Sequence, residues 1–246
     1  VHIGRHDPAL VREDRLFNLR LPAVRRFQKA HNINSIIGSQ PAIGKLGIMT
    51  VGKTTYEVND ALDSLGIDDP AKAGIGLFSV VMPWPVDPAS LIDFAKYYDE
   101  VMVVEEKRPI VEDQMARAVV NLAERAVITG KLAPDGSRLL PETGEITHAI
   151  LMTAISERAN AHGLAMRPIA KPDITTADLP KIAARTPWFC AGCPHNSSTK
   201  LPDGESDVMG IGGQSISGFL TPDIIAIFTQ MGGEGAFWIG RAPFSK

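Results

Sequence analysis

Three short runs of almost wholly apolar residues stand in the first half of the chain: Leu46–Val51, Ile75–Met82 and Val101–Val104. Runs of this length that are apolar at consecutive positions are typical of strands buried on both faces. A segment with apolar residues at helical spacing follows each run, so strand and helix alternate three times. This order predicts an α/β fold, in which a parallel sheet is flanked by helices and the crossovers are right-handed.

Several segments combine helical spacing with a recognisable start or stop. Asp87 is a good N-cap residue, and Pro88 suits the first helical position. Gly66 favours the end of the helix before it. The predicted helices are 23–31, 55–65, a segment starting at 87–88, a segment from 109 with an apolar stripe to Ala126, and 146–161.

Changes in composition divide the chain into four parts. Residues 1–44 are a lead-in that is loop-rich up to Leu21-Pro22 and then helical. Residues 45–167 hold the α/β repeat, with a loop or hairpin at Gly130–Gly144 whose turn is Asp135-Gly136. Residues 168–187 are a proline-rich linker, and residues 188–246 are the start of a second α/β unit.

Composition narrows the class of protein. The chain has 246 residues, 44% hydrophobic and 22% charged, which excludes a disordered, collagenous or disulfide-stapled chain and allows one to two domains. No apolar stretch is long enough for a transmembrane helix, and no leader precedes the first element. With two close cysteines, these features favour the cytoplasm. Because Val1 is not an initiator Met and the end follows a glycine-rich stretch, we expect a piece of a longer protein.

The charge is uneven although the net charge is only −3. Residues 1–44 carry seven Arg or Lys side chains and three acidic ones. A basic arm of this kind could contact nucleic acid, but no interleaved aromatic residues or reader motif accompany it. We therefore expect a solvated surface that packs on an acidic neighbour, with no nucleic acid and no membrane as partner.

The segment Gly47–Thr54 matches the P-loop expression G-x-x-x-x-G-K-[ST]. A phosphate-binding loop needs its first glycine at the end of a strand, whereas Gly47 lies inside an apolar run. Ile48, Met49 and Val51 are typical of a strand. A strand, a turn at Gly52 and a helix is the favoured interpretation, and a P-loop nucleotide-binding protein is the alternative.

Two thiols at C-x-x-C spacing, Cys190 and Cys193, are followed closely by His195. Zinc or an iron–sulfur cluster needs four ligands, and the sequence has no second pair of Cys or His at ligand spacing to complete the set. A redox dithiol and a tight structural turn both remain open.

Glycine-rich stretches at 210–218 and 232–235 could let the backbone approach a phosphate or could simply form turns. Neither stretch has the nicotinamide fingerprint G-x-G-x-x-G. Glu105, Glu106, Glu112 and Asp113 suit either acid–base chemistry or the first turn of a helix, where the helix dipole favours carboxylates.

Taken together, these segments resemble the indolepyruvate ferredoxin oxidoreductases, a family of thiamine-diphosphate-dependent 2-oxoacid:ferredoxin oxidoreductases. The resemblance covers most of residues 16–246. The segments that carry it are Lys45–Lys53, Asp60–Gly66, Met82–Pro85, Val103–Pro109, Trp188–Lys200 and Thr229–Gly240. It implies that residues 45–167 are a transketolase C-terminal-like domain and that residues 188–246 begin the thiamine-diphosphate-binding domain.

The resemblance also implies oxidative decarboxylation of an aryl 2-oxoacid such as indolepyruvate to an acyl-CoA. Thiamine diphosphate with Mg²⁺ would stabilise the carbanion, and iron–sulfur clusters would pass electrons to ferredoxin. The cofactor-binding residues it implies are Cys190, Gly192, Cys193, His195, Gly212, Gly213, Gly233, Glu234 and Gly235. It assigns no catalytic residue and no metal ligand within this chain.

Relatives that bind a cluster beside the thiamine cofactor carry a further Cys where this chain has Gly213, which argues against a cluster on Cys190 and Cys193. The elements that hold magnesium and diphosphate are expected after Lys246. The chain alone is therefore expected to be inactive, as a central fragment of a homo-oligomeric enzyme that includes the remaining domains. A non-catalytic module for subunit assembly is a further alternative.

Overall fold

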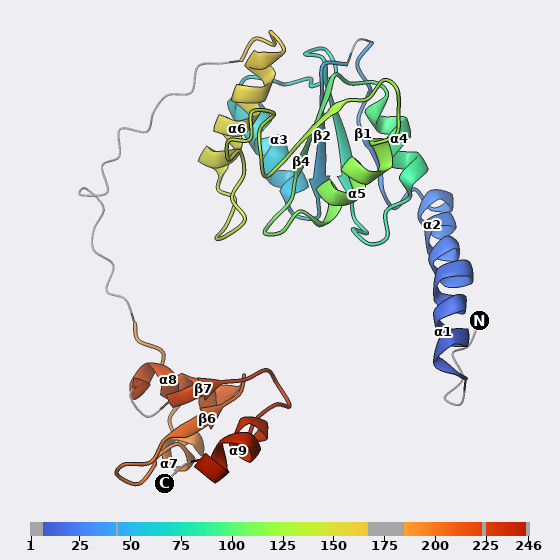
Figure 1. The fold of residues 1–246 in the computed structure, drawn as a ribbon. Coiled ribbons are helices and arrows are strands. Elements are labelled where there is room, and N and C mark those ends of the chain that lie inside the picture. The colour runs from blue at the N-terminus through green and yellow to red at the C-terminus, as the bar shows by residue number, and fades with distance from the viewer. Residues whose placement is uncertain (1–6, 43, 167–184, 223–224, 245–246) are drawn as a thin grey trace, which may run out of the picture. The chain divides into compact units, whose positions relative to one another are not determined.

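A computed structural model describes residues 7–42, 44–166, 185–222 and 225–244 of the chain (Figure 1). The chain divides into two compact units, Val1–Pro172 and Asp173–Lys246. Most of the predicted linker at 168–187 lies outside the described residues, and each unit is described by itself.

Unit 1 is built on a five-stranded sheet in the order β1-β3-β2-β4-β5. Its strands are β1 (Ser35–Ile37), β2 (Leu46–Val51), β3 (Ile75–Val80), β4 (Glu100–Val104) and β5 (Val127–Thr129). Strands β2 to β5 run parallel to one another, and the edge strand β1 pairs antiparallel with β3. The predicted parallel sheet is confirmed, with two short edge strands added.

Helices cover both faces of this sheet (Figure 1). Helices α3 (Thr54–Ser64) and α6 (His148–Ala161) lie on one face, and α4 (Pro88–Ala95) and α5 (Ile110–Val119) on the other. The α/β fold class predicted from the alternation of strands and helices is therefore correct.

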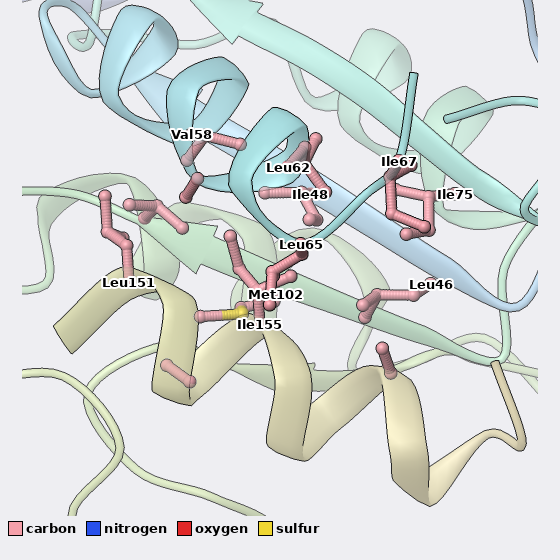
Figure 2. Close-up of a cluster of buried hydrophobic side chains, with 14 of the residues drawn as sticks. Leu46, Ile48, Val58, Leu62, Leu65, Ile67, Ile75, Met102, Leu151 and Ile155 are labelled. Carbon is pink, nitrogen blue, oxygen red and sulfur yellow. The ribbon is translucent and has the colours of Figure 1, made fainter. Parts of the chain in front are cut away.

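Alternate residues of the central strands feed two separate apolar clusters, because successive side chains of a strand point to opposite faces. Leu46, Ile48 and Met102 pack with α3 and α6, as Figure 2 shows. Met49 and Val103 pack with α4 and α5. This two-sided burial explains why the central strands are apolar at consecutive positions.

Side chains fix the beginnings of three helices. The Asp87 carboxylate accepts a hydrogen bond from the Ser90 amide at 3.3 Å, so its predicted N-cap role is confirmed. Thr147 accepts from the Ile150 amide at 3.4 Å and caps α6. At α5, the Glu105 carboxylate accepts from the amides of Val111 and Glu112, each at 2.9 Å.

The predicted loop before Leu21-Pro22 is wrong. This segment is helical throughout, as α1 (Ala9–Arg15), the π-helical turn η1 (Leu16–Arg20) and α2 (Leu21–Ala30). The π-turn directly before Pro22 accommodates its ring, which has no N–H to donate, so proline does not end the helix. Buried Gln28 joins this segment to the loop before α4, because its side-chain amide donates to the Pro85 carbonyl at 2.6 Å.

The helix after Pro109 is shorter than predicted. It ends at Val119, and Ala126 makes its buried contact from the loop that leads into β5. Of the loop or hairpin predicted at Gly130–Gly144, the structure shows a loop with one antiparallel bridge, between Leu132 and Arg138, around a turn at Gly136 whose φ is +83°.

Unit 2 contains two parallel strands, β6 (Asp207–Met209) and β7 (Ile225–Phe228). Its short helical segments are α7 (His195–Ser198), η2 (Gly213–Ile216), α8 (Ser217–Leu220), α9 (Ala236–Arg241) and η4 (Ala242–Phe244). In neither unit does the described part of the chain hold a helix with the length and apolar content to cross a bilayer.

Candidate functional site

The two glycine-rich loops of unit 2 leave the same edge of its sheet. The first, 210–213, follows β6, and the second, 229–235, follows β7. Since β6 and β7 are parallel, both loops begin at carboxyl ends of strands. Ligands of open α/β sheets bind outside that edge.

Cys190 and Cys193 are joined by a tight turn. The Cys193 amide donates to the Cys190 carbonyl at 3.1 Å, and Gly192 takes a φ of +74°, a conformation that favours glycine. The Asn196 side chain donates to the same Cys190 carbonyl at 3.1 Å. Cys190 is exposed and Cys193 is half-buried.

The imidazole of His195 connects this turn to the first glycine-rich loop. Its Nδ1 lies 3.2 Å from the Cys193 sulfur. A Cβ at Gly213 would lie 2.8 Å from its Cε1, so glycine is required there for the ring to sit as it does. The ring of Phe189 lies 5.5 Å away, centroid to centroid.

The second glycine-rich loop packs on the first through Glu234. A Cβ at Gly210 would lie 1.9 Å from the Glu234 Oε1, so that space belongs to the carboxylate. The other oxygen, Oε2, accepts from the Gly232 amide at 2.7 Å. The carboxylate therefore ties the end of β6 to the turn after β7.

The remaining site residues predicted from the sequence lie in the same loops. Gly212 is extended, with a φ of 175°, directly before η2. The Gly233 amide donates to the Gln230 carbonyl at 2.9 Å, and Gly235 precedes α9 with a φ of +80°. The structure therefore brings together two pairs of predicted site elements. His195 lies beside Gly213, and Glu234 lies beside Gly210 at the end of β6.

Sequence reasoning missed a groove of about 500 Å³ beside the cysteine turn. Buried Ser217 lines it, and the Ser217 hydroxyl contacts the Met209 sulfur at 3.4 Å. Trp188 and Phe189 line it as well, and this aromatic pair next to the cysteines was the available sequence signal. Its other lining residues include Asn196, Thr199 and Leu220.

The P-loop alternative for Gly47–Thr54 is wrong. Gly47 lies within β2, paired with Gly76 and Val101. A Cβ there would lie 2.9 Å from the Phe94 ring, so this glycine serves packing and not a phosphate. The favoured strand, turn and helix are confirmed.

Lys53, the lysine of that pattern, is occupied by carboxylates. Its Nζ lies 2.8 Å from Glu57, 3.2 Å from Glu145 and 3.4 Å from Glu106. The hydrogen bond to Glu57, followed by that to Glu145, raises the pKa of Lys53. Three carboxylates around the ammonium oppose the binding of a phosphate.

Three of the four carboxylates predicted as candidates after β4 have structural partners; one of them, Glu106, accepts from the Ile146 amide at 3.2 Å. Glu105 caps α5, and the Glu112 Oε2 accepts from the Lys131 amide at 3.0 Å. Burial raises the pKa of Glu112 and lowers the pKa of Lys131. The buried Lys131 ammonium donates to the carbonyls of Glu105 and Pro141, so it ties the hairpin to the end of β4.

Among the described residues, no group of three or more His, Cys, Asp or Glu side chains could hold a metal ion. At the cysteine turn, the described contact is between the His195 Nδ1 and the Cys193 sulfur, 3.2 Å apart.

Comparison with known proteins connects the chain to one family. The family model described as "Indolepyruvate oxidoreductase domain" matches residues 35–176. The "Indolepyruvate oxidoreductase subunit IorA" of Methanothermobacter thermautotrophicus is 33% identical over 154 residues, 62% of this chain and 22% of that protein. The protein of the same name from Thermococcus kodakarensis is 31% identical over 168 residues, 67% of this chain and 23% of that protein. The chain thus spans about a quarter of the length of these relatives.

Two solved structures overlap with it in part. A "Split gene transketolase, inactive beta4 tetramer" has a TM-score of 0.38 and 15% identity, over 52% of this chain and 41% of that one. A 2-oxoglutarate:ferredoxin oxidoreductase from Magnetococcus marinus, with 2-oxoglutarate, coenzyme A and succinyl-CoA bound, has a TM-score of 0.35 and 16% identity, over 63% of this chain and 24% of that one.

Proposed function

The chain belongs to the indolepyruvate oxidoreductase domain family, and from this premise we propose that it is part of an enzyme that oxidatively decarboxylates aryl 2-oxoacids. The substrate would resemble indolepyruvate, the product would be an acyl-CoA, and ferredoxin would accept the electrons. The observation that carries this proposal is the family match over residues 35–176.

We propose that the loops of unit 2 form one wall of a thiamine diphosphate site. That cofactor supplies stabilisation of the carbanion left when carbon dioxide departs. Two observations support the placement: both loops leave the carboxyl edge of a parallel sheet, and the cysteine turn packs against them through His195. The wall comprises Cys190, Gly192, Cys193, His195, Gly212, Gly213, Gly233, Glu234 and Gly235.

The described residues fit such a wall but not the anchor for Mg²⁺ and diphosphate. The Gly232 and Gly233 amides are already bonded, to Glu234 and to the Gln230 carbonyl. The described residues hold no cluster suited to a metal. We therefore place the anchor on other segments of the enzyme, and we assign His195 and Glu234 to positioning the loops.

The iron–sulfur clusters, ferredoxin and CoA are proposed partners of the whole enzyme, and the remaining domains and a homo-oligomeric assembly belong to the same proposal. No residue of this chain is assigned to them. A cytoplasmic location fits two cysteines that are both free.

An activity assay of the native enzyme, kept free of oxygen, tests the proposal. With indolepyruvate and CoA it should reduce a low-potential dye, and removal of thiamine diphosphate should abolish the reduction. We expect His195→Ala and Glu234→Ala each to lower the rate at least about tenfold, since displaced positioning groups cost that much or more. Lys72→Ala, at a largely exposed side chain of unit 1, is the control.

The isolated 246-residue chain should show no turnover, because the anchor is placed elsewhere. Turnover by that chain alone would contradict the proposal. If His195→Ala and Glu234→Ala both kept full activity in the native enzyme, the proposal that unit 2 forms part of the cofactor site would be contradicted.

A further inference from the structure

We propose that Cys190 and Cys193 are a thiol–disulfide exchange site, which closes to an internal disulfide by reaction with a second disulfide. The reacting partner is a small-molecule or protein disulfide, such as glutathione disulfide. This activity goes beyond the proposed decarboxylation and does not depend on it.

The turn geometry brings the two thiols within bridging range. Because the Cys193 amide is hydrogen-bonded to the Cys190 carbonyl, residues 190–193 form a β-turn, whose end Cα atoms lie within about 7 Å of each other. A disulfide needs Cα atoms about 4.4–6.8 Å apart. Gly192 at the third position supplies the positive φ that the turn requires. The turn therefore holds the two Cα atoms at a separation compatible with a disulfide.

A base is already in contact with one of the thiols. The His195 Nδ1 lies 3.2 Å from the Cys193 sulfur, within reach to accept its proton. Two neighbours limit the position of the ring: Gly213, where a Cβ would lie 2.8 Å from Cε1, and the Phe189 ring, 5.5 Å away between centroids. Only the thiolate form of a cysteine attacks a disulfide, so a positioned base sets the rate of attack.

The two cysteines differ in access, which assigns their order of reaction. Cys190 is exposed and meets an external disulfide, whereas Cys193 is half-buried beside its base.

Exchange proceeds in two balanced steps. The Cys190 thiolate attacks the external disulfide, whose S–S bond breaks, and one thiolate leaves and takes up the proton from Cys190. His195 then accepts the Cys193 proton, and the Cys193 thiolate attacks the Cys190 sulfur of the mixed disulfide. The second external thiolate leaves and is protonated by the imidazolium. The cysteine pair loses two electrons, and the external disulfide gains them.

Closure changes the contacts of the neighbouring loop. In the reduced form the Cys193 thiol is a partner for His195, and in the disulfide that sulfur has no proton to share. The ring also sits against Gly213, so the redox state of the pair bears directly on the position of the 210–213 loop.

The test is a redox titration of the 246-residue chain in glutathione buffers, read by intact mass and by thiol count. Wild type should lose the mass of two hydrogens as the buffer becomes oxidising and regain it with dithiothreitol. Cys193→Ser should instead retain one glutathione on Cys190, because the resolving thiol is missing. Cys190→Ser should react more slowly and form no internal bond.

His195→Asn tests the base, with His148→Asn, whose ring contacts Ser64 in unit 1, as the matched control. Closure from the mixed disulfide should slow by about 10²-fold in His195→Asn, the usual contribution of a positioned base. Its rate should then rise steadily with hydroxide concentration, whereas the wild type and the control should already close fast near neutral pH. If His195 had only a structural role, His195→Asn would slow closure without changing how the closure rate depends on pH.

Three results would overturn the proposal. The first is a pair that stays reduced in the most oxidising buffer. The second is separate glutathione adducts on both cysteines of wild type with no internal bond. The third is an iron–sulfur absorbance in the anaerobically isolated chain that both cysteine variants lose, which would make the pair cluster ligands. None of these readouts depends on 2-oxoacid turnover.

Discussion

Unit 1 and unit 2 are stabilised in different ways. Unit 1 buries side chains on both faces of a five-stranded sheet, with 32 of the 34 buried hydrophobic residues of the described chain. In unit 2 the buried ones are Phe189 and Met209, although the described part is rich in large apolar residues. Its exposed examples include Trp188, Phe219, Met231, Trp238, Ile239 and Phe244.

The difference shows that packing and candidate chemistry have been separated along this chain. In unit 1 the polar groups at strand ends cap helices and join loops. In unit 2 the close approaches at Gly210 and Gly213 position the loops that carry the thiols and Glu234. Stability should therefore be lost by core changes in unit 1 and little affected by exposed changes in unit 2.

The largest effect should come from the same substitution made once in each unit. Phe94→Ala removes a ring that is 1% exposed in unit 1 and should cost about 3–5 kcal/mol of unfolding free energy. Phe219→Ala removes a ring that is 65% exposed in unit 2 and should change it by about 0.5 kcal/mol or less. Urea denaturation measures the unfolding free energy of both variants. Equal losses would contradict the different contributions of unit 1 and unit 2 to stability.

The next effect lies in a buried ion network of unit 1. Arg158 donates to both Glu100 carboxylate oxygens at 2.8 Å, and Thr129 and His162 contact the same carboxylate. Glu100→Gln leaves the guanidinium without its counter-charge and should cost about 3 kcal/mol. The control is Glu157→Gln, at an exposed partner of Arg158, which should cost about 1 kcal/mol or less. Similar losses in both variants would show that the buried charge is unimportant.

This network also sets a pH dependence with a definite sign. Burial by itself would raise the pKa of Glu100, but the hydrogen bonds from Arg158, Thr129 and His162 outweigh it and lower that pKa below its ordinary value of 4.5. The native state therefore binds the proton less readily than the unfolded state. This part of the stability is present above the unfolded pKa and is lost as pH falls through the folded pKa. The difference between wild type and Glu100→Gln should shrink below pH 4.5, and a constant difference would contradict this cause.

A smaller effect should separate two glycines of unit 2. A Cβ at Gly213 meets the His195 ring, whereas nothing lies within 4 Å of one at Gly240. Gly213→Ala should destabilise the loops by about 1–3 kcal/mol through overpacking. Gly240→Ala, within α9, should be neutral or stabilising by about 0.5–1 kcal/mol. Amide hydrogen exchange of residues 189–196 measures the effect of both variants. Exchange should be faster in Gly213→Ala, and faster exchange in Gly240→Ala would contradict the importance of the Gly213–His195 contact.

The smallest effect is expected at Lys53. Its three carboxylate partners leave no vacant cation for a phosphate, so magnesium-ATP should not bind to wild type or to Lys53→Ala. Calorimetric titration of both proteins measures this. If wild type bound magnesium-ATP and Lys53→Ala did not, the P-loop interpretation would be supported and the packing role of Gly47 would be contradicted.

The sequence predicted the parts of the fold that rest on long periodic patterns. The apolar runs at 46–51 and 101–104 predicted buried parallel strands because both faces of the sheet are covered. Strands β1 and β5 have three residues each, too few for a pattern to show. The helix across Pro22 escaped prediction because the π-turn that accommodates the ring arises from backbone hydrogen bonding rather than from composition.

The candidate site was predictable as motifs and not as contacts. Spacing alone identified the cysteine pair and the two glycine-rich loops as candidates. It could not show that His195 packs on Gly213 or that Glu234 fills the space over Gly210, because these contacts join residues far apart in sequence. The groove at Ser217 was missed for the same reason.

The most direct test of a cofactor wall in unit 2 is amide hydrogen exchange of the native enzyme with and without thiamine diphosphate and Mg²⁺. We expect the cofactor to slow exchange at residues 188–195, 210–213 and 232–235, and to leave residues 46–64 of unit 1 unchanged. Protection around Gly47–Thr54 with none in the loops of unit 2 would contradict the account.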